Sequence, residues 1–145
     1  MTKSLLFVAT NPIRNPDGIV QTANALLADG WAVTLWSYST VPNDLVALNI
    51  RICGPQIAVK KQGSNQIVAR VIRAVWRKIK NRFRRDLIWW SIKRDKNLEK
   101  HAFAVVAAVD SPAIFSTWKF MKHNSNVNGR ANMTNLVAFC RSINL

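Results

Sequence analysis

The chain has 145 residues, of which 49% are hydrophobic, and its 21 Lys and Arg against 7 Asp and Glu give a formal net charge of +14. This length suits about one domain, and the apolar content supplies a sizeable core, which excludes a wholly disordered chain. The positive charge indicates an anionic partner such as a nucleic acid, a lipid surface or a phosphorylated substrate.

The first part of the chain predicts a βαβ unit, which opens an α/β domain of the Rossmann-like kind with a parallel sheet. The run SLLFVA is continuously apolar, as strands covered on both faces are. A loop over residues 10–18 follows, at the end of the strand where open α/β sheets bind ligands. From Ile19 the apolar spacing is helical, Gly30 is placed to end that helix, and a second strand is expected over residues 31–36.

The helix and second strand carry a spaced pattern, ANALLADGWAV, with Ala23, Leu26, Gly30 and Val33 as its fixed points. This pattern resembles the start of glycosyltransferases with two Rossmann-like domains, the GT-B architecture, in their retaining, nucleotide-sugar-dependent branch. The preceding loop contains neither GxGxxG nor GxxxxGK[ST], so no NAD or ATP phosphate cradle is indicated.

Two later segments extend the resemblance. LNIRIC, residues 48–53, predicts a third strand, and FAVVAAV, residues 103–109, predicts another buried strand that ends at Asp110 and precedes a helix to Lys122. The latter is similar to the family's D-V-V-x-A-x-D-x-x-A segment, although Phe103 or Ala104 replaces its first Asp. The resemblance therefore implies an N-terminal, acceptor-side domain.

The matching pieces cover residues 4–58 and 103–122, so residues 1–122 are assigned to the Rossmann-like domain. Residues 60–100 form a divergent insert within it, with 14 basic side chains and three acids, a net +11. Residues 123–145 are Asn-rich and weakly patterned. We expect a weakly ordered tail there, in which only residues 136–140 are apolar enough for a strand.

A long basic amphipathic helix is expected over residues 66–90 of the insert. At helical spacing its apolar side chains share one face: Val68, Ile72, Val75, Trp76, Ile79, Phe83 and Leu87. Candidate membrane-binding or anion-binding residues lie on the opposite side and at its end: Arg70, Arg73, Arg77, Lys80, Arg84, Trp89 and Trp90.

Three interpretations of this helix remain open. Its apolar face packs on the domain while the basic face is solvated, as in most amphipathic helices of globular proteins. Alternatively, the basic face and the aromatic residues bind an anionic membrane surface. In the third interpretation the helix binds nucleic acid, although no RNP, zinc-finger or recognition-helix pattern accompanies it.

Candidate cleft or substrate-binding residues are Asn11, Asp17, Gly18 and Asp110, which lie in or beside the loops that follow two predicted strands. Three of them have a structural alternative. Asp110 suits the N-cap of the helix that follows it, Asp17 suits the cap or the positive start of the first helix, and Gly18 suits a turn. No catalytic residue is assigned, because neither histidine belongs to a recognisable triad or ligand motif.

Cys53 and Cys140 lie far apart without CxxC spacing, which favours two buried thiols over a disulfide or a metal pair, so no metal site is expected. The first apolar run is too short for a signal peptide, and no run approaches the roughly 18 apolar residues of a membrane span. We expect a cytoplasmic chain that is peripheral on the inner face of the cell membrane.

The resemblance implies transfer of a sugar from a nucleotide-sugar donor to a lipid-linked or polysaccharide acceptor, without a covalently bound cofactor. The donor site of such enzymes lies in a second Rossmann-like domain or chain, so this chain is expected to be the inactive acceptor-side half when alone. A non-enzymatic membrane-binding α/β module is the alternative from another class, and a basic nucleic-acid binder is the third.

Overall fold

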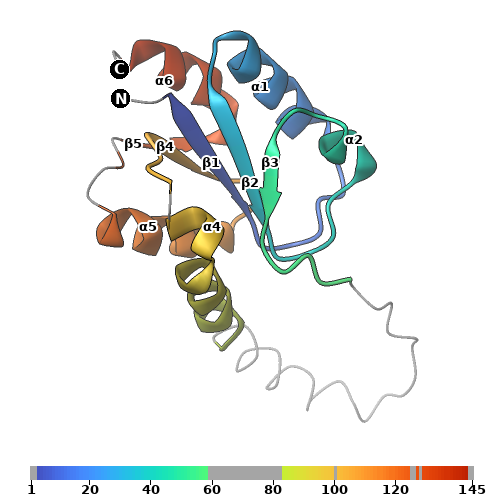
Figure 1. Ribbon diagram of the computed structural model, residues 1–145, viewed down its shortest axis with the longest axis vertical. Helices are drawn as coiled ribbons and strands as arrows, with labels where there is room; N and C mark the ends of the chain where they lie inside the picture. Colours follow the sequence, from blue (N-terminus) through green and yellow to red (C-terminus); the bar gives the residue numbers. More distant parts are fainter. Residues whose placement is uncertain (1–2, 59–82, 100, 125–126, 128, 144–145) are drawn as a thin grey trace.

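The computed structural model describes residues 3–58, 83–99, 101–124, 127 and 129–143 (Figure 1). In this part of the chain five strands form one sheet in the spatial order β3-β2-β1-β4-β5, and each neighbouring pair is parallel. The α/β class with a parallel sheet is thereby confirmed. This order places β1 in the centre of the sheet. From β1 the chain adds β2 and β3 on one side and then β4 and β5 on the other, as in doubly wound Rossmann-like folds.

The strands are β1 (Ser4–Ala9), β2 (Ala32–Ser37), β3 (Arg51–Cys53), β4 (Val105–Ala108) and β5 (Gly129–Asn132). The helices are α1 (Asp17–Ala28), α2 (Asn43–Val46), α4 (Lys96–Glu99), α5 (Ala113–His123) and α6 (Leu136–Ser142), with a 3-10 turn η1 (Met133–Asn135). Residues 83–94 are also helical.

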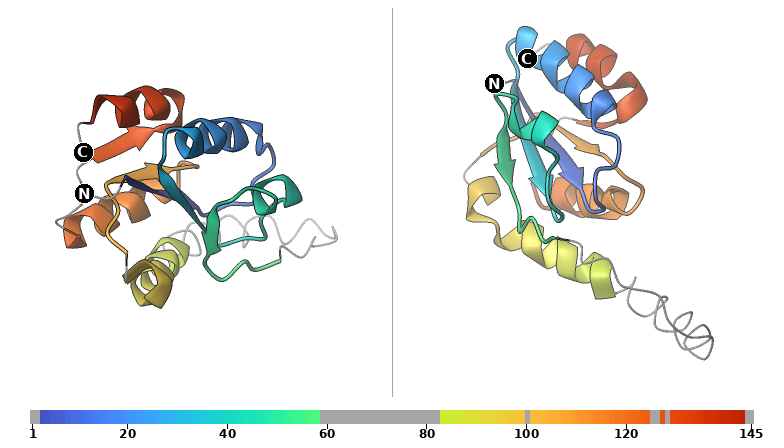
Figure 2. Two further views of the ribbon diagram at one scale, coloured as in Figure 1. Left: turned by 45° about the horizontal axis from the view of Figure 1, so that its top comes forward. Right: turned by 90° about the vertical axis from the view of Figure 1, so that its right-hand side faces the viewer.

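The helices cover both faces of the sheet (Figure 2). The face that carries α1, α2 and α6 shares a core with Leu5 and Phe7, and the face that carries α5 and the helix at 83–94 shares a core with Leu6 and Val8. Successive β1 side chains alternate between these two cores, because side chains of a strand point to opposite faces. The continuous apolar run that predicted a strand covered on both sides is therefore explained.

The end of α1 confirms the prediction for Gly30, which has φ +78° and lies just past the helix. The amide of Gly30 donates to the Leu27 carbonyl at 3.0 Å, and that of Trp31 donates to the Leu26 carbonyl at 2.9 Å. These two bonds form a Schellman motif, which satisfies the last carbonyls of the helix. At the other end Asp17 is the first helical residue and makes no capping bond, so of its two expected roles only the favourable charge in the first turn applies.

In the helix at 83–94 the buried residues are not those of the predicted apolar stripe. Ile88, Trp89 and Ile92 are buried, whereas Phe83 and Leu87 of that stripe are exposed, so over these residues the interpretation in which the stripe packs on the domain does not hold. Most of the predicted basic helix, with Arg70, Arg73, Arg77 and Lys80, lies outside the described residues, so its full length stays a prediction.

Residues after 122 contribute to the same sheet. β5 pairs with β4 in parallel, and α6 packs against α1, with Leu136 fully buried. Residues 136–140, the only part of the tail judged apolar enough for a strand, form a helix instead and belong to α6. Its apolar residues fall on one helical face that completes the core beside α1. How firmly residues 123–145 are ordered in solution stays a prediction.

Candidate functional site

The candidate site lies where the chain changes direction in the sheet. β1 and β4 are adjacent and parallel, with Val8 beside Ala108, so their carboxyl ends lie side by side at the same end of the sheet. The chain leaves β1 toward α1 on one face and leaves β4 toward α5 on the other. The loops therefore diverge and leave a crevice, the position at which open α/β sheets bind ligands.

Asp110 joins the two loops at this point. Its Oδ2 accepts hydrogen bonds from the amides of Thr10 and Asn11, both at 2.8 Å. Its Oδ1 accepts from the Thr10 hydroxyl at 2.6 Å and from the amide of Ala113, the first residue of α5, at 2.9 Å. Four donors thus occupy the acceptor positions of one carboxylate, which has about four.

This network decides what Asp110 does. Both expectations for it hold in part, since it lies at the carboxyl end of a strand and also bonds to the start of the following helix. Because all its acceptor positions are engaged, the Asp110 carboxylate holds the two loops together and has no free oxygen lone pair with which to act as a general base. The amides of Thr10 and Asn11 are likewise engaged, so they do not form a phosphate cradle.

Arg84 reaches the same loops from the helix at 83–94. Its Nη2 donates to the Thr10 carbonyl oxygen at 3.5 Å and to the Asn11 side-chain oxygen at 3.4 Å. Arg84 is half-buried here, beside the sheet edge. The sequence placed it on a basic face with Arg73 and Arg77 and gave no signal that it would contact a loop more than 70 positions earlier.

Two cavities open at this edge. One, with a volume of about 510 Å³, is the switch-point cleft, and it is lined by Asn11, Arg84, Arg85, Ile88, Ser111 and Pro112. The other, of about 610 Å³, lies alongside it, where Asp110, Ile114 and Met133 join Asn11. Asn11, Ser111 and Pro112 line both cavities, so the two form one depression of mixed polar and apolar character along the ends of β1 and β4.

The predicted cleft residues are therefore divided. Asn11 and Asp110 come together at the switch point, whereas Asp17 and Gly18 are exposed on the first turn of α1 and line none of the cavities described here. Of the predicted membrane-binding residues in the described segment, Arg84 faces the cleft and Trp89 is buried at 8% exposure. Trp90 is exposed, as expected.

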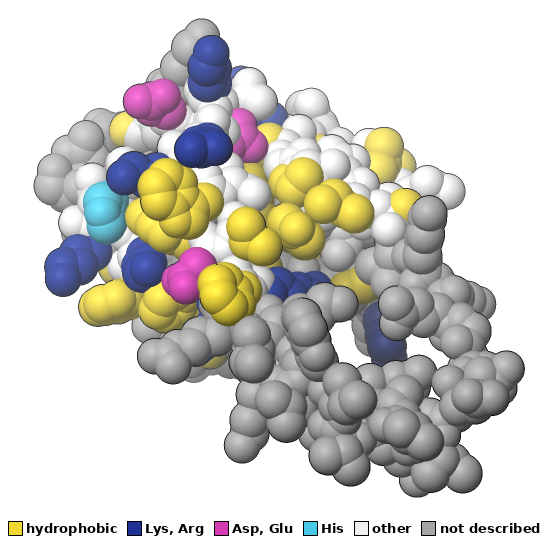
Figure 3. All heavy atoms as spheres, turned by 90° about the horizontal axis from the view of Figure 1, so that it is seen from below, with side chains coloured by type: hydrophobic (Ala, Val, Ile, Leu, Met, Phe, Trp, Pro, Cys, Tyr) yellow, Lys and Arg dark blue, Asp and Glu magenta, His cyan; other side chains and the backbone are white. Residues whose placement is uncertain are grey.

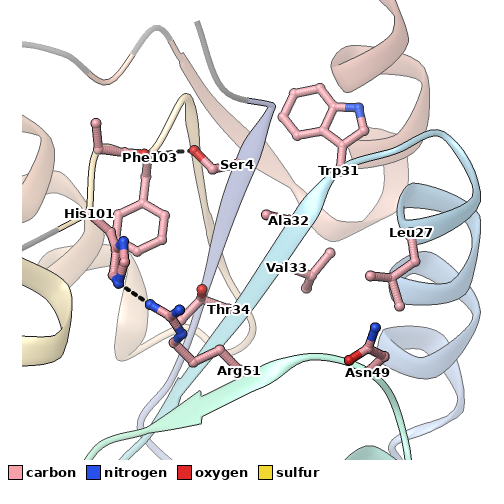
Figure 4. Close-up of a pocket in the computed structure, with 11 residues that line it drawn as sticks. Ser4, Leu27, Trp31, Ala32, Val33, Thr34, Asn49, Arg51, His101 and Phe103 are labelled. Atoms are coloured by element: carbon pink, nitrogen blue, oxygen red, sulfur yellow. Dashed lines mark hydrogen bonds between the residues drawn. The ribbon is translucent and has the colours of Figure 1, made fainter.

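Another cavity, of about 540 Å³, lies at the opposite end of the sheet, among the residues that begin the strands (Figure 4). Arg51 and His101 are hydrogen-bonded across it, and the Ser4 hydroxyl donates to the Ala102 carbonyl at 2.7 Å. Because parallel sheets bind ligands at the carboxyl ends of their strands, this cavity is the weaker candidate site. His123, the last residue of α5, contacts the ring of Trp89 at a centroid distance of 5.0 Å and lines none of these three cavities.

The two cysteines are buried and separate, as expected. Burial, aided by the negative charge of Asp95, raises the pKa of the Cys53 thiol to about 12. Burial alone raises the pKa of Cys140 to about 11. Neither thiol is a nucleophile near neutral pH. Among the described residues, no group of three or more His, Cys, Asp or Glu side chains is arranged to hold a metal ion.

The outward side of the helix at 83–94 carries a stripe of exposed apolar residues, which we call the aromatic face. It consists of Phe83, Leu87 and Trp90, at 66%, 59% and 52% exposure. The side chains of Lys93 and Arg94 lie over the Trp90 ring at 5.9 and 5.2 Å from its centroid. Figure 3 views the molecule from the side of this helix and α5, where hydrophobic side chains lie among Lys and Arg.

α5 repeats this pairing with its own residues. Ile114 and Trp118, one helical turn apart, are exposed, and Lys122 lies 5.5 Å from the centroid of the Trp118 ring. The two helices are joined by Arg85, which lies over the Phe115 ring at 5.2 Å from its centroid, and by an ion pair of 3.9 Å between Lys119 and Asp86. Apolar and basic groups are therefore mixed on both helices.

No family model, curated protein or solved structure matches this chain. Within the described part of the chain, no helix has the length and apolar content needed to cross a bilayer. The class defined by the fold and the site is thus a doubly wound α/β domain with a polar, arginine-bearing cleft at its switch point.

Proposed function

We propose that this chain is the acceptor-side domain of a nucleotide-sugar-dependent glycosyltransferase. The observation that supports the proposal is the position of Asp110, which accepts hydrogen bonds from the first loop next to a cleft lined by Asn11, Arg84 and Ser111. The resemblance of the βαβ unit to the retaining GT-B branch supplies the reaction: a sugar passes from a nucleotide-sugar to a hydroxyl of a lipid-linked or polysaccharide acceptor.

The hydrogen bonds of the loop amides support the assignment of the donor and the acceptor to different domains. Thr10 and Asn11 give their amides to Asp110, so these two amides, the ones nearest the cleft, are not available to cradle a ligand. A nucleotide diphosphate is commonly held by free amides at such a loop or at a helix N-terminus. In this proposal the donor is therefore held by a second Rossmann-like domain or chain, and the switch-point cleft receives the acceptor.

The test is an NMR titration of the full chain with 15N-labelled amides. A lipid-linked sugar and a polysaccharide fragment serve as acceptor ligands, and a nucleotide-sugar serves as the donor. We expect saturable shifts at Asn11 and Ser111 with an acceptor ligand. The donor carries a diphosphate of its own, so the comparison is one of affinity, and the acceptor should bind more tightly than the donor. Absence of saturable shifts with both acceptors, or tighter binding of the donor than of either acceptor at these amides, would overturn the proposal.

A second candidate function is peripheral binding to an anionic membrane, which the aromatic face favours. Trp and Phe are suited to the interfacial region of a bilayer, and each nearby Lys or Arg contributes about 1 kcal/mol of attraction to an anionic leaflet. Lys93 and Arg94 lie next to Trp90, so apolar insertion and charge attraction act at one place. This would hold the chain on the cytoplasmic side of the cell membrane, with or without an enzymatic role.

Vesicle co-sedimentation tests the second candidate. The wild type is expected to bind vesicles that contain anionic phospholipid and to ignore zwitterionic ones, and Leu87→Ser is expected to weaken binding severalfold. Val46→Ser, which changes an exposed apolar residue on α2, is the matched control and should leave binding unchanged. Equal binding by both variants would contradict membrane docking through this face, and salt-sensitive retention on duplex DNA without vesicle binding would favour the nucleic-acid interpretation.

A further inference from the structure

Arg84, in the cleft, uses only part of its hydrogen-bonding capacity within the described residues. A guanidinium has five N–H donors in a planar fork, and the two hydrogen bonds of Arg84 within the described residues both involve Nη2. The ion pairs among those residues are Lys119–Asp86 and Arg141–Asp29, so no described carboxylate neutralises Arg84. Its contacts to Thr10 and Asn11 hold one corner of the fork and orient the remaining donors.

A second guanidinium lines the same cavity. Arg85 lies 5.2 Å from the centroid of the Phe115 ring, which fixes the direction of its exposed side chain. Asn11 and Ser111 add a carboxamide and a hydroxyl to the lining, and Ile88 supplies an apolar wall. Two arginines with neutral donors around a cavity of about 510 Å³ form a set suited to phosphate oxygens, which arginine binds in a bidentate manner.

Neither acidic residue close to the two arginines opposes this assignment: Asp86 is paired with Lys119 at 3.9 Å, and Asp110 is engaged by the two loops. Asp110 lines the neighbouring cavity and not the one with the two arginines. Its oxygens face the amides of Thr10, Asn11 and Ala113 and the Thr10 hydroxyl, which stabilise its charge locally. An anion beside Arg84 and Arg85 therefore meets donors first.

We infer that the switch-point cleft binds a phosphate or diphosphate group through Arg84 and Arg85, with Asn11 and Ser111 as neutral donors. This inference deepens the proposed function, because it assigns the acceptor to the class of phosphate-bearing molecules. It rests on the proposed function only in identifying the ligand of the cleft as the acceptor. The ligand is either a free diphosphate or the head group of a lipid diphosphate, and the two sources share the same recognition.

The test measures binding of inorganic pyrophosphate to the full chain by calorimetry, at a salt concentration near 0.15 M, where nonspecific attraction to a chain of +14 is screened. Arg84→Gln is expected to weaken binding about tenfold, which corresponds to 1.4 kcal/mol. Arg94→Gln, which removes the same charge from the far end of the same helix, beside Trp90, is the matched control and should change affinity by less than about twofold.

Arg85→Gln provides a second variant in case Arg84→Gln loses structure, because the Arg85 side chain is exposed. Arg85→Gln is expected to weaken pyrophosphate binding about threefold. In an NMR titration of the wild type with pyrophosphate, the shifted amides are expected to be those of Asn11 and Ser111. Equal losses in the Arg84, Arg85 and Arg94 variants would show charge attraction alone and overturn the inference, as would the absence of saturable binding.

A parallel titration with geranyl diphosphate separates the sources. Tighter binding than pyrophosphate, lost on Arg84→Gln, indicates a lipid diphosphate, and equal affinity indicates a free diphosphate. Failure of the inference differs from failure of the proposed function, since pyrophosphate binding without any response to a sugar-bearing acceptor leaves the phosphate site intact and removes the glycosyltransferase assignment.

Discussion

Replacement of Asp110 by alanine is expected to destabilise the domain through the two loops that the carboxylate joins. The change leaves the amides of Thr10 and Asn11 without their acceptor. Ala113 loses less, because its amide also donates to the backbone carbonyl of residue 110 at 3.0 Å. The Thr10 hydroxyl can rotate to another acceptor, so two amides determine the cost.

The magnitude follows from these two amides. Thr10 is fully buried, whereas Asn11 is half-buried, so water partly compensates the second. An unsatisfied buried donor costs about 1–3 kcal/mol, which gives a total loss of roughly 2–4 kcal/mol. In a domain of this size the same loss lowers the midpoint of thermal unfolding by roughly 5–12 °C.

The assay is urea unfolding followed by circular dichroism, with Asp17→Ala as the control. Asp17 carries the same charge in the first turn of α1, where its replacement should cost less than about 1 kcal/mol. Asp110→Asn should lose less than half as much as Asp110→Ala, because a carboxamide oxygen can still accept from both amides while its NH2 turns to the Thr10 hydroxyl. A loss below about 1 kcal/mol for Asp110→Ala, or one equal to that of Asp17→Ala, would refute this account of the loops.

Three further predictions concern the interior. Cys53 and Cys140 should resist a thiol reagent at pH 8 until the chain unfolds, because burial raises their pKa values to about 12 and about 11, and rapid labelling of the native chain would contradict this. Since the unfolded thiols ionise near pH 9 and the folded ones do not, stability should fall as the pH rises from about 9 toward 11. Leu136→Ala should cost about 2–5 kcal/mol in urea unfolding, because Leu136 is fully buried against α1; a loss below about 1 kcal/mol would instead support the expectation of a weakly ordered tail.

The sequence predicted the elements that depend on local signals. A continuous apolar run identified β1, helical spacing identified α1, and Gly30 marked the end of α1, because one strand buried on both faces or one helix end carries its own pattern. The tail lacked such a signal. β5 reads GRAN and has no apolar run, so its place in the sheet depends on pairing with β4, which no local pattern encodes.

The site was only half predictable for a related reason. Asn11 and Asp110 follow strands, so their meeting follows from parallel pairing of β1 and β4. Arg84 reaches them only because Ile88 and Ile92 seat its helix in one rotational setting. The apolar residues of that helix extend around more than one face, and the sequence spacing could not decide which of them packs on the sheet.

That rotational setting links the two proposals. At about 100° per residue, Phe83, Leu87 and Trp90 lie within about 60° of one another and roughly opposite Ile88 and Ile92. A helix seated by its isoleucines therefore places Arg84 at the sheet edge and turns the aromatic face outward. A phosphate carried on a lipid is the ligand that would engage both sides at once, since its charged head suits the cleft and its bilayer suits the aromatic face.

Leu87→Ser and Arg84→Gln separate these contributions: the first should reduce vesicle binding and spare pyrophosphate affinity, and the second should reduce pyrophosphate affinity and spare vesicle binding. If each variant impaired both, a change in the seating of the helix would explain the loss, and the two surfaces could not be assigned separate ligands.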